Sequence, residues 1–327
     1  MQAERKTRIS MKIVFMGTPD FAVGALQAII EAGHQVVAVV TQPDKPKGRG
    51  KEMQMTPVKV CAITHGIPVF QPVKVKTPEA VEVLRGYGAD IFVVAAFGQI
   101  LSEEILNLPK YGCVNIHASL LPKYRGAGPI QWAIIDGEKK TGVTIMQMDK
   151  GLDTGDMLFK AEVEISDDET GDSLHDKLAE AGARLIVEAL PKIEAGDVTP
   201  VKQNDEESCY AKMLQKSMGR IDWQQSADKL DCLIRGLISW PGAYTTYHGK
   251  NLKIWEEKAV DAKEAGIQLT DAAPGTIVGV EKDAVYVQTG DGVLKILSLQ
   301  LEGKKRMAVR DFLLGCQMKA GEQLGQE

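Results

Sequence analysis

The chain has few cysteines, and none of them is arranged as a metal or disulfide motif. Its 327 residues include five cysteines at irregular positions, and no two are spaced as Cys-x-x-Cys. An odd number at such spacing argues against a zinc ribbon and against a disulfide framework. We therefore expect reduced thiols, as in a cytosolic protein, and no metal.

Long apolar runs are also missing from the sequence. No stretch approaches the roughly 18 apolar residues that span a bilayer, and residues 1–10 lack the apolar segment of a signal peptide. We expect a cytoplasmic protein that does not insert into a membrane. The length and the 44% of hydrophobic residues suffice for two domains that each bury a core.

An excess of positive charge is absent too, because the formal net charge is −5. Dedicated nucleic-acid-binding domains are usually basic, so RNA binding requires a local patch. One candidate is residues 41–56 (TQPDKPKGRGKEMQMT), a long connection between strand and helix. Its cations are Lys45, Lys47, Arg49 and Lys51. A solvated surface loop is the alternative interpretation, and both stay open.

The glycines of a dinucleotide-binding site are missing as well. The first apolar run, residues 12–16, ends at Gly17-Thr18-Pro19-Asp20-Phe21-Ala22. A G-x-G-x-x-G turn is what lets the backbone approach a pyrophosphate. Its absence disfavours a nicotinamide-dependent oxidoreductase.

Apolar runs alternate with helical segments over the first part of the chain. The runs lie at 12–16, 35–40, 67–70, 91–95 and 113–116. Strands that are apolar throughout are typical of a parallel sheet covered on both faces. Hydrophobic spacing predicts helices over 21–31 and 173–190 and further strands over 141–147 and 157–165. The predicted fold class is α/β, with a Rossmann-like open, mostly parallel sheet.

The sequence changes character near residue 194. Residues 194–207 are polar, with Gly and Pro, and are typical of a linker. A predicted helix at 226–237 and short strands at 252–255, 276–280, 284–288 and 293–301 follow. Such strands with Gly turns indicate a second small β-barrel, OB-like domain. We predict domains over 11–193 and 208–327, joined by a linker at 194–207.

The chemically densest segment is residues 115–122 (NIHASLLP), directly after an apolar strand. Ligands of open α/β sheets bind beyond the carboxyl ends of the strands. Asn115 and His117 share a face of the extended chain, and an amide with an imidazole suits an oxyanion at an acyl centre. Asp153, in the glycine-bracketed loop 151–156, is the candidate for orienting His117. The alternatives are a structural histidine, an Asn that caps a turn and an Asp that caps the glycine turn.

These motifs, in this order, resemble those of the folate-dependent formyltransferases. The segments concerned are 15–21 (FMGTPDF), 42–51, 115–122, 125–126 (Arg-Gly) and 151–156 (GLDTGD). The resemblance extends through both domains and is to the branch whose acceptor is methionyl initiator tRNA. It implies transfer of a formyl group from 10-formyltetrahydrofolate to the α-amino group of that tRNA, for translation initiation.

The resemblance also implies roles for individual residues. Asn115, His117 and Asp153 would form the catalytic group, with no metal: the first two stabilise the oxyanion and Asp153 orients His117. The folate would lie against two loops that hold Ser119, Leu120, Leu121, Pro122, Phe97, Gly98 and Leu101. As an alternative, the apolar members are ordinary core residues.

For the tRNA, the resemblance implies contacts from Lys45, Lys47, Arg49 and Lys51, together with the C-terminal domain. We expect a monomer. Four other functions stay open: formylation of glycinamide ribonucleotide or of an amino sugar nucleotide, deformylation of the folate, and RNA binding by a lapsed enzyme scaffold. The second domain disfavours the first, and the absence of a dehydrogenase-like half after residue 207 disfavours the second.

Overall fold

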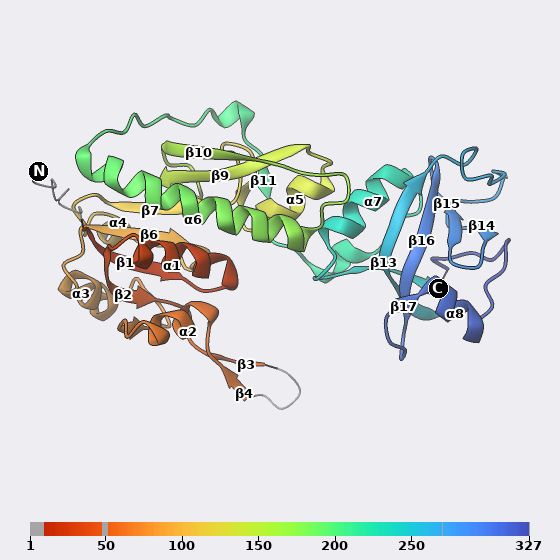
Figure 1. Cartoon of the computed structure of the whole chain (residues 1–327), viewed down its shortest axis with the longest axis horizontal. Helices are drawn as coiled ribbons and strands as arrows, with labels where there is room; N and C mark the ends of the chain where they lie inside the picture. Colours follow the sequence, from red (N-terminus) through yellow and green to blue (C-terminus); the bar gives the residue numbers. More distant parts are fainter. Residues whose placement is uncertain (1–9, 48–51, 270, 327) are drawn as a thin grey trace, which may run out of the picture. The chain divides into compact units, whose positions relative to one another are not determined.

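The computed structural model describes residues 10–47, 52–269 and 271–326 (Figure 1). They form two compact units. The N-terminal unit takes Met1–Gly126, Lys140–Glu164 and His175–Ala211, and the C-terminal unit takes Ala127–Lys139, Ile165–Leu174 and Lys212–Glu327. The predicted boundaries at 194–207 stay a prediction. In the compact units, residues 194–207 lie within the N-terminal unit, and two segments that precede residue 193, Ala127–Lys139 and Ile165–Leu174, lie with the C-terminal unit.

A seven-stranded sheet forms the centre of the N-terminal unit, in the order β10-β9-β7-β6-β1-β2-β5. Its strands are β1 (Lys12–Gly17), β2 (Gln35–Val40), β5 (Val69–Phe70), β6 (Ile91–Ala95), β7 (Cys113–His117), β9 (Lys140–Gln147) and β10 (Met157–Glu164). The first five are parallel, and β9 and β10 add an antiparallel edge. The predicted Rossmann-like, mostly parallel sheet is confirmed.

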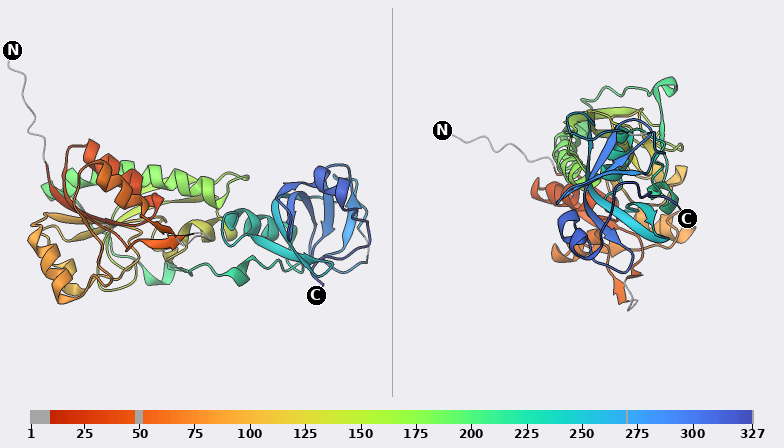
Figure 2. Two further views of the ribbon diagram at one scale, coloured as in Figure 1. Left: turned by 90° about the horizontal axis from the view of Figure 1, so that it is seen from below. Right: turned by 90° about the vertical axis from the view of Figure 1, so that its right-hand side faces the viewer.

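Helices cover both faces of this sheet (Figure 2). The unit contains η1 (Asp20–Ala22), α1 (Val23–Glu31), α2 (Pro57–Thr64), α3 (Pro78–Gly86), α4 (Glu103–Leu106), most of α6 (Gly171–Ala195) and η2 (Asp205–Glu207). Gly182 brings α6 close to Ile116 on one face. On the other face, Leu84 of α3 and Ile105 of α4 share a core with Cys113 of β7.

The alternation of β7 decides where its polar side chains point. Cys113 packs into the core under α3 and α4. Since side chains alternate along a strand, Asn115 and His117 point to that same face. Val94 of the parallel strand β6 lies opposite Asn115. The loops that follow β6 and β7 therefore emerge side by side at one edge of the sheet.

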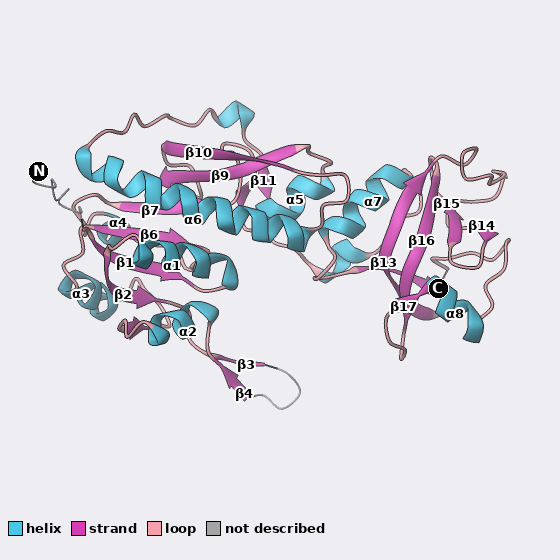
Figure 3. Ribbon diagram, viewed as in Figure 1, coloured by secondary structure: helices cyan, strands magenta, loops and turns pink. Residues whose placement is uncertain are grey.

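Two short strands within the segment 41–56 pair as a hairpin, apart from the large sheet (Figure 3). Its strands are β3 (Lys45–Lys47) and β4 (Glu52–Gln54), which pair antiparallel. The hydroxyls of Thr41 and Thr56 hydrogen-bond to one another at 2.8 Å across its base. Nearby, the Asp44 carboxylate accepts from Lys59 Nζ at 2.6 Å. Lys45 is exposed on β3, while the predicted tRNA contacts Arg49 and Lys51 lie outside the described residues.

The C-terminal unit is built on an antiparallel sheet of order β12-β13-β16-β15-β14, with β17 paired to β16. Its strands are β12 (Ala243–Tyr247), β13 (Lys250–Val260), β14 (Ile277–Val280), β15 (Val285–Gln288), β16 (Val293–Leu301) and β17 (Met307–Ala308). Its helices are α5 (Pro129–Ile135), η3 (Lys216–Gly219), α7 (Ala227–Gly236) and α8 (Val309–Gly315). Leu230 and Ile234 of α7 pack into the core of this sheet.

The last residues of the chain bond to both edges of that sheet. The Gly325 N–H donates to Thr246 O of β12 at 2.9 Å, and the Leu324 N–H donates to Gly275 O, just before β14, at 2.8 Å. A small antiparallel second domain is confirmed, while its OB-like character stays a prediction. None of the helices in the described parts of the chain is long and apolar enough to cross a membrane.

Candidate active site

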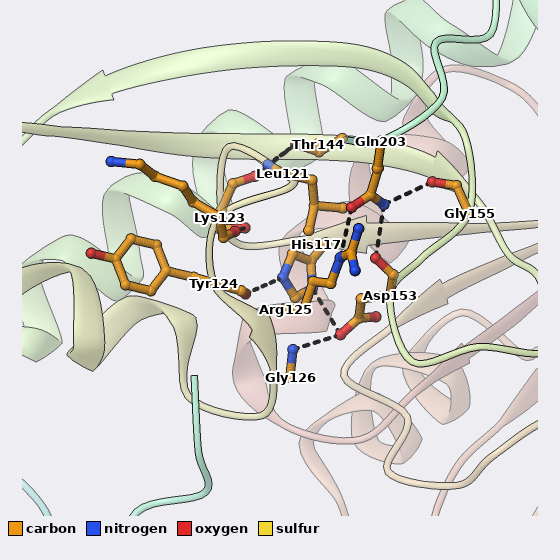
Figure 4. A network of polar contacts seen from close by, with 11 residues as sticks. His117, Leu121, Lys123, Tyr124, Arg125, Gly126, Thr144, Asp153, Gly155 and Gln203 are labelled. Carbon is orange, nitrogen blue, oxygen red and sulfur yellow. Dashed lines mark hydrogen bonds and ion pairs between the residues drawn. The ribbon is translucent and has the colours of Figure 1, made fainter. Parts of the chain in front are cut away.

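His117 ends β7 with a buried side chain, 6% exposed. Its Nε2 lies 2.8 Å from the carbonyl oxygen of Tyr124. A carbonyl only accepts, so Nε2 carries the ring proton and donates it. Nδ1 then faces Asp153 Oδ2 at 3.8 Å (Figure 4). This distance exceeds that of a hydrogen bond, so Nδ1 lies close to the carboxylate but is not hydrogen-bonded to it.

Asp153 comes from the loop between β9 and β10. Its backbone is in the left-handed region, with φ +55, which costs roughly 1–2 kcal/mol for a residue with a side chain. Its Oδ2 accepts from the Gly126 N–H at 2.9 Å. The glycine turn itself is held by Asp149, whose Oδ1 accepts from the Gly151 N–H at 2.9 Å and from Thr154 Oγ1 at 2.8 Å. Asp153 is thereby left to face His117.

Close packing explains the second glycine of this loop. A Cβ at position 155 would lie 1.7 Å from the carbonyl oxygen of Gln147. Gly155 therefore lets the loop run directly against the end of β9, which places Asp153 beside β7.

Asn115 supplies an amide on the same strand face as His117. The residue is half-buried in the middle of β7, between Val94 of β6 and Met146 of β9. Across the described ranges, no residue hydrogen-bonds to its side chain. The amide is therefore available to a bound molecule.

The loops predicted to hold a ligand lie at this sheet edge, but most of their side chains face inward. Ser119 and Leu121 are fully buried, and Phe97 and Leu101 are 2% and 5% exposed. Leu120 and Pro122 are half-buried, and Gly98 is exposed. Phe97, Leu101 and Leu121 therefore pack as core residues, which was the alternative to a ligand role. A ligand role for all seven residues stays a prediction.

Internal bonds hold the loop after β7 in place. Ser119 Oγ donates to Lys123 O at 2.7 Å. Thr144 Oγ1 donates to Ser119 O at 2.7 Å and accepts from the Leu121 N–H at 3.1 Å. Lys160 Nζ donates to Leu121 O, and burial lowers the pKa of this lysine.

One contributor to the site was missed from the sequence. Gln203 of the expected linker donates from Nε2 to the carbonyl oxygens of Asp153 and Gly155, both at 2.8 Å. Its Oε1 accepts from Arg125 Nε at 2.9 Å (Figure 4). No local pattern marks Gln203, and the only signal was its partner Arg125 in the 125–126 motif. Within the described residues, no cluster of three or more His, Cys, Asp or Glu could hold a metal ion.

Comparison with known proteins adds to this geometry. Residues 11–190 match the family model described as formyl transferase, and residues 213–317 match that of the formyl transferase C-terminal domain. The chain is 55% identical to methionyl-tRNA formyltransferase of Agathobacter rectalis, over 95% of this chain and 98% of that one. It is 54% identical to methionyl-tRNA formyltransferase of Lachnospira eligens, over 97% and 100%.

Solved structures show the same fold at low identity. HypX from Aquifex aeolicus in complex with tetrahydrofolic acid is 18% identical with a TM-score of 0.62, over 93% of this chain and 47% of that one. WlaRD, a sugar 3N-formyl transferase, is 20% identical with a TM-score of 0.62, over 91% and 100%.

Proposed function

The chain belongs to the formyl transferase family, and on that premise we propose that it transfers a formyl group from 10-formyltetrahydrofolate to the α-amino group of methionyl initiator tRNA. The observation that carries this proposal is 55% identity to a methionyl-tRNA formyltransferase over 98% of that relative. Similarity of this extent covers both family domains, so the acceptor as well as the chemistry is expected to be shared.

The proposed chemistry uses one donor and one titratable group on β7. When bound, 10-formyltetrahydrofolate supplies the formyl group on its N10 atom. The Asn115 amide, to which no other described residue hydrogen-bonds, and a protonated Nδ1 of His117 donate to the formyl oxygen as negative charge develops there. Asp153, 3.8 Å from Nδ1, orients the ring and accepts the proton that the attacking amine loses. The amine nitrogen bonds to the formyl carbon, the bond to N10 breaks, and N10 receives the proton.

The folate is proposed to lie between the loops after β6 and β7. The observation in favour is that both loops emerge beside Asn115, since β6 and β7 are adjacent and parallel. Exposed Gly98 and half-buried Leu120 and Pro122 are accessible there. Buried Ser119, Leu121, Phe97 and Leu101 would act mainly by shaping the backbone that the ligand contacts.

We propose that the hairpin at 41–56 and the C-terminal domain bind the tRNA. In support, Lys45 is exposed on a hairpin with an anchored base, and Lys47, Arg49 and Lys51 add positive charge to the same segment. In the C-terminal unit, Lys304, Lys305 and Arg306 are exposed. Cations at such positions suit a phosphate backbone. The protein is proposed to act as a monomer in the cytoplasm.

A formyl-transfer assay tests the proposed reaction. The purified chain is incubated with 10-formyltetrahydrofolate and, in parallel, methionyl initiator tRNA, uncharged tRNA, glycinamide ribonucleotide, an amino sugar nucleotide or buffer. We expect formylation of the charged initiator tRNA alone. Transfer to another amine or plain deformylation would overturn the acceptor and keep the donor chemistry, and no turnover with any acceptor would overturn both.

A further inference from the structure

We propose that Gln203 is a positioning residue for Asp153, so that residues 201–211 are a working part of the active site rather than a linker. The inference rests on the proposed function, because it assigns Asp153 a task in formyl transfer. The single amide of Gln203 connects three elements of the site: the loop that carries Asp153, the loop after β7, and its own segment.

The orientation of the Gln203 amide is fixed by its partners. The carbonyls of Asp153 and Gly155 only accept hydrogen bonds, so the NH₂ end must face them, at 2.8 Å each. The Arg125 guanidinium only donates, so the oxygen end must face its Nε, at 2.9 Å. Both donors and the acceptor are used, and a flipped amide would lose all three bonds.

The backbone of loop 151–156 requires stabilising contacts from outside the loop. Asp153 has φ +55, a conformation that persists only where the surroundings enforce it. Its side chain is held by one backbone bond, from the Gly126 N–H, and is 3.8 Å from His117 Nδ1. The two bonds from Gln203 hold the carbonyl of the strained residue itself and that of Gly155, two positions later, while Asp149 holds the turn at Gly151 and Thr154.

Residues 201–211 also hydrogen-bond to the loop after β7, whose Gly126 N–H contacts Asp153. The Arg125 N–H donates to Cys209 O at 2.9 Å, and Arg125 Nη2 donates to Asp205 Oδ1 at 2.8 Å. β8 (Arg125–Gly126) pairs in parallel with β11 (Tyr210–Ala211). Gly126 thereby keeps its N–H directed at the Asp153 carboxylate. Both loops are held by one stretch of chain, so their relative position depends on it.

The Gln203 bonds act on placement rather than on charge. Their loss leaves the catalytic side chains unchanged but frees the backbone of loop 151–156. A displacement of about 1 Å at a reacting group can lower turnover roughly 100-fold. Among the described residues, Gln203 hydrogen-bonds to Arg125, Asp153 and Gly155 and to none of the seven residues proposed to hold the folate, so donor binding should be nearly unaffected.

Two substitutions test the positioning role in the full-length protein. Gln203→Leu removes all three bonds, whereas Gln203→Glu keeps an acceptor for Arg125 and turns oxygen toward the two carbonyls. We expect both to lower kcat about 10- to 100-fold and to leave KM for 10-formyltetrahydrofolate within about twofold. Gln215→Leu is the matched control, because Gln215 is exposed and its side chain caps nothing; it should be unchanged.

Hydrogen exchange gives a readout that is independent of activity. Backbone amides of residues 151–156 should exchange faster in both Gln203 variants and at the normal rate in Gln215→Leu. Unchanged exchange would show that Gln203 does not hold loop 151–156, whether or not the wild type proves to formylate tRNA. Faster exchange with unchanged kcat would overturn the positioning role, and recovery of kcat by Gln203→Glu would show that Arg125 pairing alone matters.

Discussion

At the residue scale, one hydrogen bond decides the orientation of the histidine. Because Nε2 donates to the Tyr124 carbonyl, Nδ1 is the nitrogen that faces Asp153. The ring cannot turn over without leaving a buried donor unsatisfied, which costs about 1–3 kcal/mol. The same side chain is therefore both part of the packed interior and ready for chemistry, which unites the structural and catalytic interpretations of His117.

Removing the imidazole should abolish most turnover. We expect His117→Ala to lower kcat by roughly 100- to 10,000-fold, the range typical of a positioned acid–base group. His65→Ala serves as the control, since His65 is an exposed histidine of the same unit. Single-turnover formyl transfer to methionyl initiator tRNA measures both. Normal turnover of His117→Ala would remove this residue from the mechanism.

The proximity of His117 and Asp153 agrees with the sequence expectation, but the contacts that hold the Asp153 loop in place could not be predicted from the sequence. The strand-end position of His117 and the glycines around Asp153 are local patterns that predict a shared sheet edge. The bonds from Gln203 to loop 151–156 join residues about 50 apart in sequence. Such contacts depend on where the polar segment 194–207 runs, and its composition specifies only that it is exposed.

At the element scale, the long connection at 41–56 contains two paired strands, β3 and β4. The Thr41–Thr56 bond closes its base, and Asp44 is held by Lys59 and Gln71. The hydrogen bond from Lys59 lowers the pKa of the Asp44 carboxyl, so this anchor remains ionised at neutral pH. The described base of the hairpin is therefore anchored to the rest of the N-terminal unit.

Neutralising the hairpin should weaken use of the tRNA. We expect Arg49→Ala to raise KM for methionyl initiator tRNA several-fold and to reduce the salt dependence of kcat/KM by about one counterion. KM for the folate should not change. Lys76→Ala is the control, an exposed cation outside the hairpin. Equal tRNA kinetics in wild type and Arg49→Ala would contradict a role for this segment in RNA binding.

Strand β13 carries a buried acid whose titration should be visible in stability. Glu257 is 7% exposed, and among the described residues its Oε1 has no hydrogen-bond partner. Burial and then the charge of Asp231 raise the pKa of this carboxyl from 4.5 to about 8. The folded protein therefore keeps a proton that the unfolded chain releases between these pH values.

The free energy of unfolding should therefore fall as pH rises from 4.5 to about 8, by up to about 1.4 kcal/mol per pH unit from this group. Glu257→Gln should remove that slope, and at the upper end of this pH range it should be more stable than the wild type. Urea unfolding of the two proteins, followed by pH, measures the difference. Glu264→Gln, an exposed acid of the same unit, should keep the wild-type slope; a wild-type slope in Glu257→Gln would refute the assignment.

At the scale of the whole molecule, apolar runs and helical spacing predict most of the elements but not the division into units. The runs at 35–40 and 91–95 coincide with β2 and β6, because burial on both faces leaves a clear local pattern. By contrast, α5 (Pro129–Ile135) belongs to the C-terminal unit. It packs against α7, about 100 residues later, and nothing in the sequence near α5 indicates that partner.

This discontinuity predicts that residues 11–211 will not fold completely as a separate fragment. Ile130 and Ile134 of α5 are 8% and 1% exposed, and Gly236 of the missing α7 lies against Ile135. Removal of α7 exposes this apolar face to water, which lowers the free energy of unfolding by about 1.5–3 kcal/mol for each side chain that is fully exposed. Hydrogen exchange should show lost protection at 127–139 and 165–174 and retained protection in β1, β2 and β6. Full protection of both segments in the fragment would instead support the contiguous domain predicted over 11–193.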